Sequence, residues 1–394
     1  MRRYQNQDFS RIQYDNPSDP QGFRKVWIAM RKMIDAHLDL AMNLVFYDRD
    51  ITASLADMNA AEEGFSDQKF RTRGTVTLPE MRQAQIPVCL ATLLARSGPE
   101  HRRAPSYRRS DLDFPLVSGA YASCWAQRSH YHELEQRGEI RQLRTRQDLE
   151  SHWQQWKVAE GTEGLPVGVI LSVEGADPIH SPETLDEWFD WGVRAIGLAH
   201  YGQGRYAAGT GTPGGLTDLG RSLLPEMSRL GIALDVTHLA DDAMAEAFDL
   251  YEGPVWASHH NCRALVDWDR QLTDGQITRL IDRDGVIGLA FDAVMLHPSW
   301  ERGVSQPESL PIEWAADHVD HICQLAGSTR HCGIGTDLDG GYGSEQTPRE
   351  LKSIQDVHRL EEIFSKRGYT DEDIDAIFWG NWLRKLLDSL PESI

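Results

Sequence analysis

Long apolar runs are absent from this sequence, and cysteine is scarce. No stretch of about 18 apolar residues occurs, so we expect no transmembrane helix and no membrane association. The paired arginines near the start are followed by polar residues rather than by the apolar core of a secretion signal. The five cysteines are widely spaced and include no Cys-x-x-Cys, which argues against a disulfide framework and a thiolate zinc site. These absences predict a reduced, cytoplasmic protein.

Positive charge is also in short supply. The chain has 40 lysines and arginines against 60 acidic residues, which gives a net charge of -20. Binding to a nucleic acid requires a concentrated positive field, so we expect a small-molecule partner instead. At 394 residues, with 40% hydrophobic and 25% charged content, the chain is typical of globular proteins. We expect one large α/β domain over residues 1–394.

Short apolar runs alternate with helical patterns along the chain. The eight runs that we interpret as strands cover residues 33–40, 86–94, 167–173, 193–199, 232–237, 254–257, 286–291 and 332–336. Eight such units in one chain predict a (β/α)8 TIM-type barrel. An open doubly wound sheet is the alternative, but no Gly-x-Gly-x-x-Gly turn follows any of the runs.

The segments outside these units carry weaker signals. Residues 1–22 resemble a surface arm, residues 23–31 a short helix, and residues 97–165 a long connection between the second and third strands. Four arginines of that connection form either a solvated loop or a lid that attracts an anionic substrate, namely Arg102, Arg103, Arg108 and Arg109. Pro225 predicts a kink or a break in the helix over residues 217–230.

Histidines and acidic residues follow most of the predicted strands. These residues are His37, Asp39, Glu174, His200, His238, His259 and Asp337. Any one of them could simply hydrogen-bond a loop or cap a helix. In a barrel, however, the C-terminal strand ends meet at one mouth, where barrel enzymes place their chemistry. The joint pattern therefore predicts a metal site at that mouth.

The number and type of these side chains favour two metal ions. Three histidines with Asp39 and Glu174 exceed what one tetrahedral zinc with an open position needs, but they suit two ions that share a carboxylate. We assign Glu174 as the bridge because its strand lies midway around the barrel. Two such ions lower the pKa of a bridging water and polarise a carbonyl, which predicts hydrolysis without a protein nucleophile. The donor set would also accept manganese or cobalt.

Several motifs in order along the chain resemble the membrane (renal) dipeptidase family of binuclear zinc hydrolases, a branch of the amidohydrolase barrels. The resemblance extends from about residue 33 to residue 386. The motifs are residues 34–39 (IDAHLD), 173–175 (VEG), 215–220 (GLTDLG), 235–238 (DVTH), 257–259 (ASH), 270–274 (RQLTD), 335–340 (GTDLDG) and 380–384 (GNWLR).

The resemblance implies a ligand set and a reaction. His37, Asp39 and Glu174 would hold one zinc ion, and Glu174, His238 and His259 would hold the other. A metal-bridging hydroxide would hydrolyse the amide bond of a dipeptide with a free C-terminal carboxylate, with a D-residue tolerated at that end. The resemblance also implies a homodimer.

The resemblance implies three further roles. His200 would contact the scissile carbonyl and its developing oxyanion. Arg270 would bind the substrate carboxylate, which suits the bidentate geometry of a guanidinium. Asp337 would carry a proton from the water to the leaving amine, as a carboxylate beside an activated water can. By sequence alone, Arg270 is one arginine in a loop.

The sequence departs from the family pattern on the substrate side. Leu38 stands where the family has Asn, His260 where it has Ser, and residues 91–96 and 201–208 replace other family segments. We expect His260 to pack beside the metal site. The departures leave three alternatives to a dipeptidase open: hydrolysis of another small amide such as an N-acyl amino acid, a metal-binding barrel without turnover, and a single-metal isomerase or lyase.

Overall fold

Eight parallel strands pair side by side in the order in which they occur along the chain. The computed structural model describes residues 11–14, 26–98 and 112–393. The eight strands are β3 (Ile34–Leu38), β4 (Val88–Leu94), β8 (Val167–Glu174), β9 (Val193–Gly197), β10 (Ala233–Asp235), β11 (Val255–Trp256), β12 (Ile287–Leu289) and β13 (Cys332–Ile334). Every residue of β8 is buried, as expected for a parallel strand covered on both faces.

The sheet closes on itself between β11 and β12. Ala257 and Ile287 form a parallel bridge at this seam. The nitrogen of Ala257 donates to the Val286 carbonyl at 3.0 Å, and the nitrogen of Gly288 donates to the Ala257 carbonyl at 2.8 Å. The nearly closed ring confirms the predicted (β/α)8 barrel and excludes the open doubly wound sheet.

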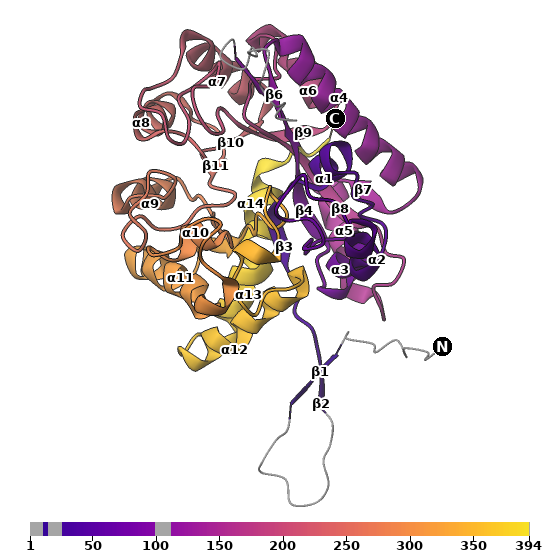
Figure 1. Cartoon of the computed structure of the whole chain (residues 1–394). Helices are drawn as coiled ribbons and strands as arrows, with labels where there is room; N and C mark the ends of the chain where they lie inside the picture. Colours follow the sequence, from indigo (N-terminus) through magenta and orange to yellow (C-terminus); the bar gives the residue numbers. More distant parts are fainter. Residues whose placement is uncertain (1–10, 15–25, 99–111, 394) are drawn as a thin grey trace, which may run out of the picture.

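Helices cover the outside of the barrel (Figure 1). In chain order they are α1 (Leu40–Tyr47), α2 (Leu55–Ala61), α3 (Leu78–Gln83), α4 (Val117–Gln136), α5 (Arg146–Val158), α6 (Leu185–Asp190), α7 (Asp218–Leu230), α8 (Asp241–Leu250), α9 (Asp274–Asp282), α10 (Ala293–Leu296), α11 (Glu313–Ala326), α12 (Arg359–Lys366), α13 (Asp371–Asp375) and α14 (Asn381–Ser389). Their starts follow local chemistry: Thr273 caps α9 reciprocally with Gln276, and Ile277 and Leu280 bury one face of that helix. Among the described residues, no helix combines the length and apolar character that crossing a membrane requires.

One local prediction was wrong, and the helix break considered at Pro225 is absent. Residues 26–29 form β2 (Val26–Ala29), antiparallel to β1 (Arg11–Tyr14), where a helix was expected; the run of Val26, Trp27 and Ile28 favours a strand. Gly138, with φ +75°, follows the end of α4, and β7 (Ile140–Gln142) then pairs parallel with β8. Helix α7 runs through Pro225 without a break, because a proline removes only one helical hydrogen bond and Leu224 and Met227 remain buried.

The long connection between β4 and β8 has structure of its own. It contains α4, β7 and α5, and the short strands β5 (Arg96–Ser97) and β6 (Asp113–Phe114) pair at its start. The remainder of the predicted N-terminal arm and the four arginines of the predicted lid lie outside the described residues.

Candidate metal centre

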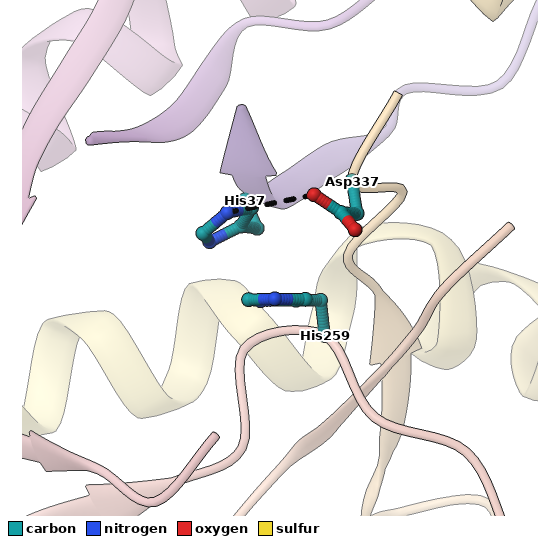
Figure 2. Close-up of side chains that lie close together, drawn as sticks. All are labelled: His37, His259 and Asp337. Atoms are coloured by element: carbon teal, nitrogen blue, oxygen red, sulfur yellow. Dashed lines mark ion pairs between the residues drawn. The ribbon is translucent and has the colours of Figure 1, made fainter. Parts of the chain in front are cut away.

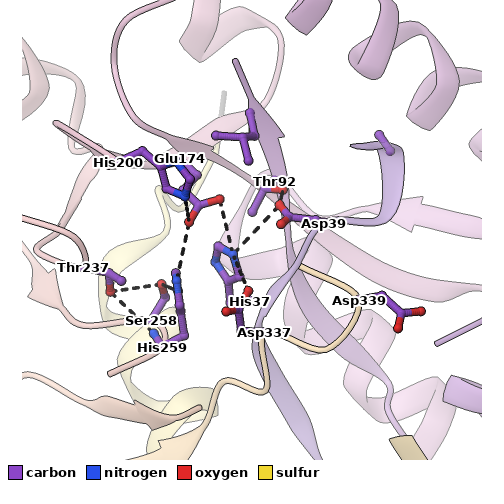
Figure 3. Close-up of polar contacts among 12 residues, drawn as sticks. His37, Asp39, Thr92, Glu174, His200, Thr237, Ser258, His259, Asp337 and Asp339 are labelled. Carbon is purple, nitrogen blue, oxygen red and sulfur yellow. Dashed lines mark hydrogen bonds and ion pairs between the residues drawn. The ribbon is translucent and has the colours of Figure 1, made fainter. Parts of the chain in front are cut away.

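The residues singled out at the strand ends converge at one mouth of the barrel (Figure 3). His37 lies in β3 and Glu174 is the last residue of β8. Four more lie three positions beyond the end of a strand, namely His200, His238, His259 and Asp337. Because every strand runs the same way, this regular offset brings the side chains to the same end of the barrel.

Glu174 lies between two groups of histidines. Its Oε2 is 3.5 Å from Nε2 of His37 on one side. Its Oε1 is 3.2 Å from Nε2 of His238 and 3.5 Å from Nε2 of His259 on the other side. The two oxygens of one carboxylate therefore face different nitrogen donors.

Two carboxylates border the His37 side of this cluster. Asp39 Oδ1 lies 3.9 Å from His37 Nε2, and Asp337 Oδ1 lies 3.7 Å from the same nitrogen (Figure 2). The rings of His37 and His259 approach to 3.7 Å between centroids. Three overlapping groups of three side chains thus have their potential ligand atoms within 4.8 Å of one another. Two of these groups share Glu174, and the third joins His37 and His259 with Asp337.

The donor set fits divalent cations. Nε2 of His37 and Oε2 of Glu174 are buried and have no hydrogen-bond partner among the described residues. Burying polar atoms without partners is costly, so their arrangement is best explained by a ligand that both would contact. Imidazole nitrogens with carboxylate oxygens are ligands that zinc, manganese and cobalt accept. The residues present therefore fit two ions that share Glu174.

Burial and charge set the protonation of these groups. Burial lowers the pKa of His238 and His259 well below the usual value, which keeps both rings neutral and able to coordinate. Burial also acts to lower the pKa of His37, but the charges of Glu174 and Asp39 outweigh it and raise that pKa to about 10. The cluster of acids around His37 thus favours a cation at this position.

Hydroxyl groups orient the ligand side chains from behind. Ser258 Oγ lies 2.9 Å from Nδ1 of His259, and Thr210 Oγ1 lies 3.1 Å from Nδ1 of His238. These bonds leave the Nε2 atoms directed at Glu174, as outer hydrogen bonds do around protein-bound metals. The Thr92 hydroxyl donates to Asp39. These partners were not predicted from the sequence. Ser258 directly precedes its histidine, but the two threonines come from other segments and leave no local signal.

Two buried aspartates repeat one structural role around the barrel. Asp35 Oδ1 accepts a hydrogen bond from the amide of Thr336, just after β13, at 2.9 Å. Asp235 Oδ1 accepts one from the amide of Ser258, just after β11, at 3.0 Å. Asp35 precedes His37 by two residues, and Asp235 precedes His238 by three. The Asp-x-His and Asp-x-x-His spacings were the signal that could have identified them.

A cavity of about 560 Å³ opens at this cluster, and its wall includes His200, Arg270 and Asp337. His200 Nε2 lies 3.6 Å from Glu174 Oε1, and burial lowers the pKa of this histidine to about 4. Arg270 is 1% exposed; its Nη2 donates to the His259 carbonyl at 3.0 Å, while Nη1 has no partner among the described residues. Asp337 has φ +58°, and burial beside Glu174 raises its pKa well above the usual value.

Two residues that depart from the family pattern are buried and do not form part of the cavity wall. His260 is 2% exposed and Leu38 is fully buried, and neither lines the cavity. Tyr201, in the replaced segment 201–208, does line the cavity, with its ring 4.9 Å from that of His200 and 5.0 Å from that of His238. Leu94, in the replaced segment 91–96, also lines it, so both altered segments contribute to the cavity wall.

The fold and the site together define a parallel barrel with a candidate binuclear metal centre at its C-terminal mouth. Residues 24–388 match the sequence model of the membrane dipeptidase family, peptidase family M19, and the chain belongs to that family. The prediction of this family from sequence motifs is thereby confirmed.

Known relatives and solved structures agree with this assignment. The chain is 31% identical over 238 residues to an uncharacterized dipeptidase of Schizosaccharomyces pombe, an alignment that covers 58% of this chain and 55% of the relative. It is 29% identical over 230 residues to the dipeptidase tcpJ of Claviceps purpurea, covering 56% and 51% of the two chains. The matches thus span about half the length of these curated relatives.

Two crystal structures share the fold over nearly the whole chain. A metallopeptidase from Rhodobacter sphaeroides, liganded with a phosphinate mimic of L-Ala-D-Ala, is 22% identical with a TM-score of 0.70 and covers 92% of this chain and 99% of its own. The dipeptidase AC, also of family M19, is 23% identical with a TM-score of 0.71 and covers 92% and 100%.

Proposed function

We propose that this protein hydrolyses the amide bond of dipeptides that carry a free C-terminal carboxylate. The observation that supports this most strongly is the position of Glu174, whose two oxygens face His37 on one side and His238 with His259 on the other. A carboxylate so placed suits a pair of metal ions, and paired ions serve hydrolysis by water without a protein nucleophile. Membership of the membrane dipeptidase family supports the substrate class.

The cofactor in this proposal is a pair of divalent ions, with zinc expected. His37, Asp39 and Glu174 would hold one ion, and Glu174, His238 and His259 the other. When bound, such ions lower the pKa of a shared water and polarise the substrate carbonyl. The protein's own contribution is to keep His238 and His259 neutral by burial and to fix their rings through hydroxyl groups.

Arg270 and His200 would position the substrate. The guanidinium of Arg270 is buried with Nη1 unpartnered, and a substrate carboxylate would supply the missing hydrogen bond. His200 lies beside Glu174, and its low pKa keeps the ring neutral, so its one N–H would donate to the carbonyl oxygen as negative charge develops there. Both side chains line the same cavity as Glu174.

Asp337 would carry the proton. The water oxygen forms a bond to the carbonyl carbon, the C–N bond breaks, and the proton lost by the water reaches the nitrogen of the leaving amino acid by way of Asp337. Burial raises the pKa of this carboxyl, and cations held by its neighbours would lower it again. Such a group can both accept and return a proton near neutral pH.

The stereochemistry of the substrate is part of the proposal. We expect a D-residue to be tolerated at the C-terminal position, and the dipeptide mimic bound to the Rhodobacter sphaeroides relative, with D-Ala at that end, supports this expectation. An N-acyl amino acid is the competing substrate, because the same attack by water would serve.

Amine release by zinc-loaded protein from L-L, L-D and D-L dipeptides tests the proposal. C-terminally amidated and N-acylated versions belong in the same panel, with chelated protein as the blank. We expect turnover confined to dipeptides with a free carboxylate and free amine. Arg270→Met should then reduce kcat/KM by about 10²-fold or more through the lost charge-assisted bond. Turnover of amidated compounds instead would contradict the assigned carboxylate, and inactivity toward every compound would contradict hydrolysis.

Three other expectations stay predictions. These are a single domain over residues 1–394, a homodimer and a cytoplasmic location. Light scattering coupled to size-exclusion chromatography would test the dimer directly.

A further inference from the structure

Two unpaired cations line the cavity in addition to Arg270. Lys69 and Arg73 both face it, and neither forms an ion pair with any described residue. The other cation of the wall, Arg302, is neutralised by Asp292, with Nη2 at 2.9 Å from Oδ2. Unpaired positive charge is notable here because the whole chain carries a net charge of -20.

Lys69 and Arg73 belong to the connection between α2 and α3, which spans part of the cavity mouth. The Lys69 side chain reaches the loop that follows α10. Its Nζ lies beside Gly303, 2.6 Å from the position that a Cβ atom would take there. The Arg73 carbonyl accepts the Ser344 amide at 2.8 Å, which ties it to the loop that follows β13. The two cations are therefore held between loops of the barrel mouth.

Buried ion pairs fasten this connection to the barrel. Glu62 Oε1 accepts Nε of Arg49 at 2.8 Å and Nη1 of Arg71 at 2.7 Å, and Glu62 Oε2 accepts the Thr72 amide at 2.6 Å. The side chains of Arg49, Glu62 and Arg71 are 1%, 4% and 6% exposed. Just beyond them, Asp339 accepts both the amide and the hydroxyl of Thr75, at 2.9 and 2.8 Å.

Burying so many charges contributes little net stability, because the cost of desolvation offsets most of the attraction. What such a network does supply is a fixed position for the polar residues of this segment, alongside its buried apolar residues Phe70 and Val76. A rigid support reduces the entropy lost when a ligand binds. The support therefore favours the binding of an anionic group by Lys69 and Arg73.

Positive charge lines the cavity at two places. Arg270 lies deep, with an unpartnered Nη1 beside the metal cluster, whereas Lys69 and Arg73 are exposed at the mouth. We infer that Lys69 and Arg73 form a second anion subsite, and that the preferred substrates are dipeptides with an acidic side chain. This inference rests on the proposed dipeptidase function, in which Arg270 takes the main-chain carboxylate.

The physical reason is electrostatic. A dipeptide with an extra carboxylate would be repelled by the acidic surface unless the cavity supplied compensating positive charge. Charge-assisted hydrogen bonds from an ammonium or a guanidinium also contribute more than neutral ones. The subsite should therefore increase kcat/KM for acidic dipeptides relative to neutral ones, and added salt should reduce the difference.

Selectivity measured on paired substrates tests the inference. The panel is Ala-Ala, Ala-Glu, Glu-Ala and Ala-Lys, hydrolysed by zinc-loaded wild type and by the double variant Lys69→Met with Arg73→Met. We expect kcat/KM of the wild type to be roughly tenfold higher for either Ala-Glu or Glu-Ala than for Ala-Ala. The double variant should lower that ratio of kcat/KM values roughly 5- to 20-fold. The matched control is Lys157→Met with Arg137→Met, two exposed cations that do not line the cavity.

The outcomes separate this inference from the proposed function. Hydrolysis of Ala-Ala with no preference for either acidic dipeptide overturns the subsite and leaves the dipeptidase function intact. A second readout needs no turnover: calorimetry on metal-free protein should show glutarate binding more tightly than butyrate in wild type but not in the double variant. Equal affinity of the two acids for wild type also overturns the subsite, whatever the panel shows. Circular dichroism confirms that each variant is folded.

Discussion

The hydroxyl of Thr336 donates to Oδ2 of Asp35 at 2.6 Å, which joins the strand end that carries Asp337 to the strand that carries His37. Both side chains are fully buried. Thr336→Val keeps the shape but leaves a buried carboxylate oxygen without its donor, so we expect a loss of about 1–3 kcal/mol in the free energy of unfolding. Urea unfolding followed by tryptophan fluorescence measures it. Thr52→Val, which removes an exposed hydroxyl bonded to Asp50, is the control and should cost less than about 0.5 kcal/mol.

Metal content should depend on Glu174 more than on any other acid. We expect wild type to retain two divalent ions per chain after dialysis, and Glu174→Gln to retain at most one, because a single substitution weakens both halves of the centre. Elemental analysis by mass spectrometry reports the ratio. Glu187→Gln, which alters an acid bonded to Tyr121 away from the cavity, should leave the content unchanged. Two ions retained by the Glu174 variant would argue against a bridging role.

Replacing Asp337 should separate chemistry from metal binding. We expect Asp337→Asn to lower kcat by about 10²–10⁴-fold, as for the loss of a general acid and base, with metal content and KM little changed. Kinetics and elemental analysis on the same preparation provide the test. Because Asp337 also lies within ligand distance of His37 and His259, a loss of one ion in this variant would identify it as a ligand instead.

Stability should fall in mild acid through a histidine remote from the cavity. Burial lowers the pKa of His152 from 6.5 to about 4, and its Nε2 bonds the Pro87 carbonyl at 2.8 Å. Below pH 6.5 the unfolded chain takes up a proton that the folded protein refuses, so this stability is present above pH 6.5 and is lost as the pH falls toward 4. We expect His152 to account for about 2 kcal/mol of the difference in unfolding free energy between pH 7.5 and 5.0.

Comparison with His152→Gln isolates this contribution. His318, whose pKa burial also lowers to about 4, is present in both proteins and cancels in the comparison. Urea unfolding of each protein at the two pH values gives four free energies, and the variant should show the smaller drop. Equal drops in the two proteins would mean that His152 is protonated to the same extent in the folded and unfolded states.

The barrel was predictable because buried parallel strands require continuous apolar runs, and all eight runs became strands. The omission and the error arose where no such requirement acts. β7, for which no prediction was made from the sequence, is three residues long and pairs with β8 shortly after the turn at Gly138. The strand over residues 26–29 pairs with β1 far from the barrel, so neither barrel packing nor helical periodicity marked it (Figure 1).

The candidate site was predictable only in part. Histidines and acids at strand ends could be grouped because the fold brings those ends together, and the structure does bring them together; their individual roles stay predictions. Arg270 came from family resemblance alone, since a loop arginine has no periodic signal. Lys69 and Arg73 could not be found at all, because contacts from the loops after α10 and β13 position them.

The seam between β11 and β12 is held by fewer bonds than the pairing of β4 with β8. Three backbone bonds hold the chain together there, the third from the His260 amide to the Gly288 carbonyl at 2.7 Å, whereas β4 and β8 are in register over seven residue pairs. The seam is therefore expected to open more often than the β4–β8 pairing, and its amide hydrogens to exchange with solvent sooner than those of β4 and β8. His259 lies within this seam, between Ala257 and His260, so each opening would withdraw one imidazole while the other half of the candidate centre stayed in place. An ion could leave or enter by that route without the barrel unfolding.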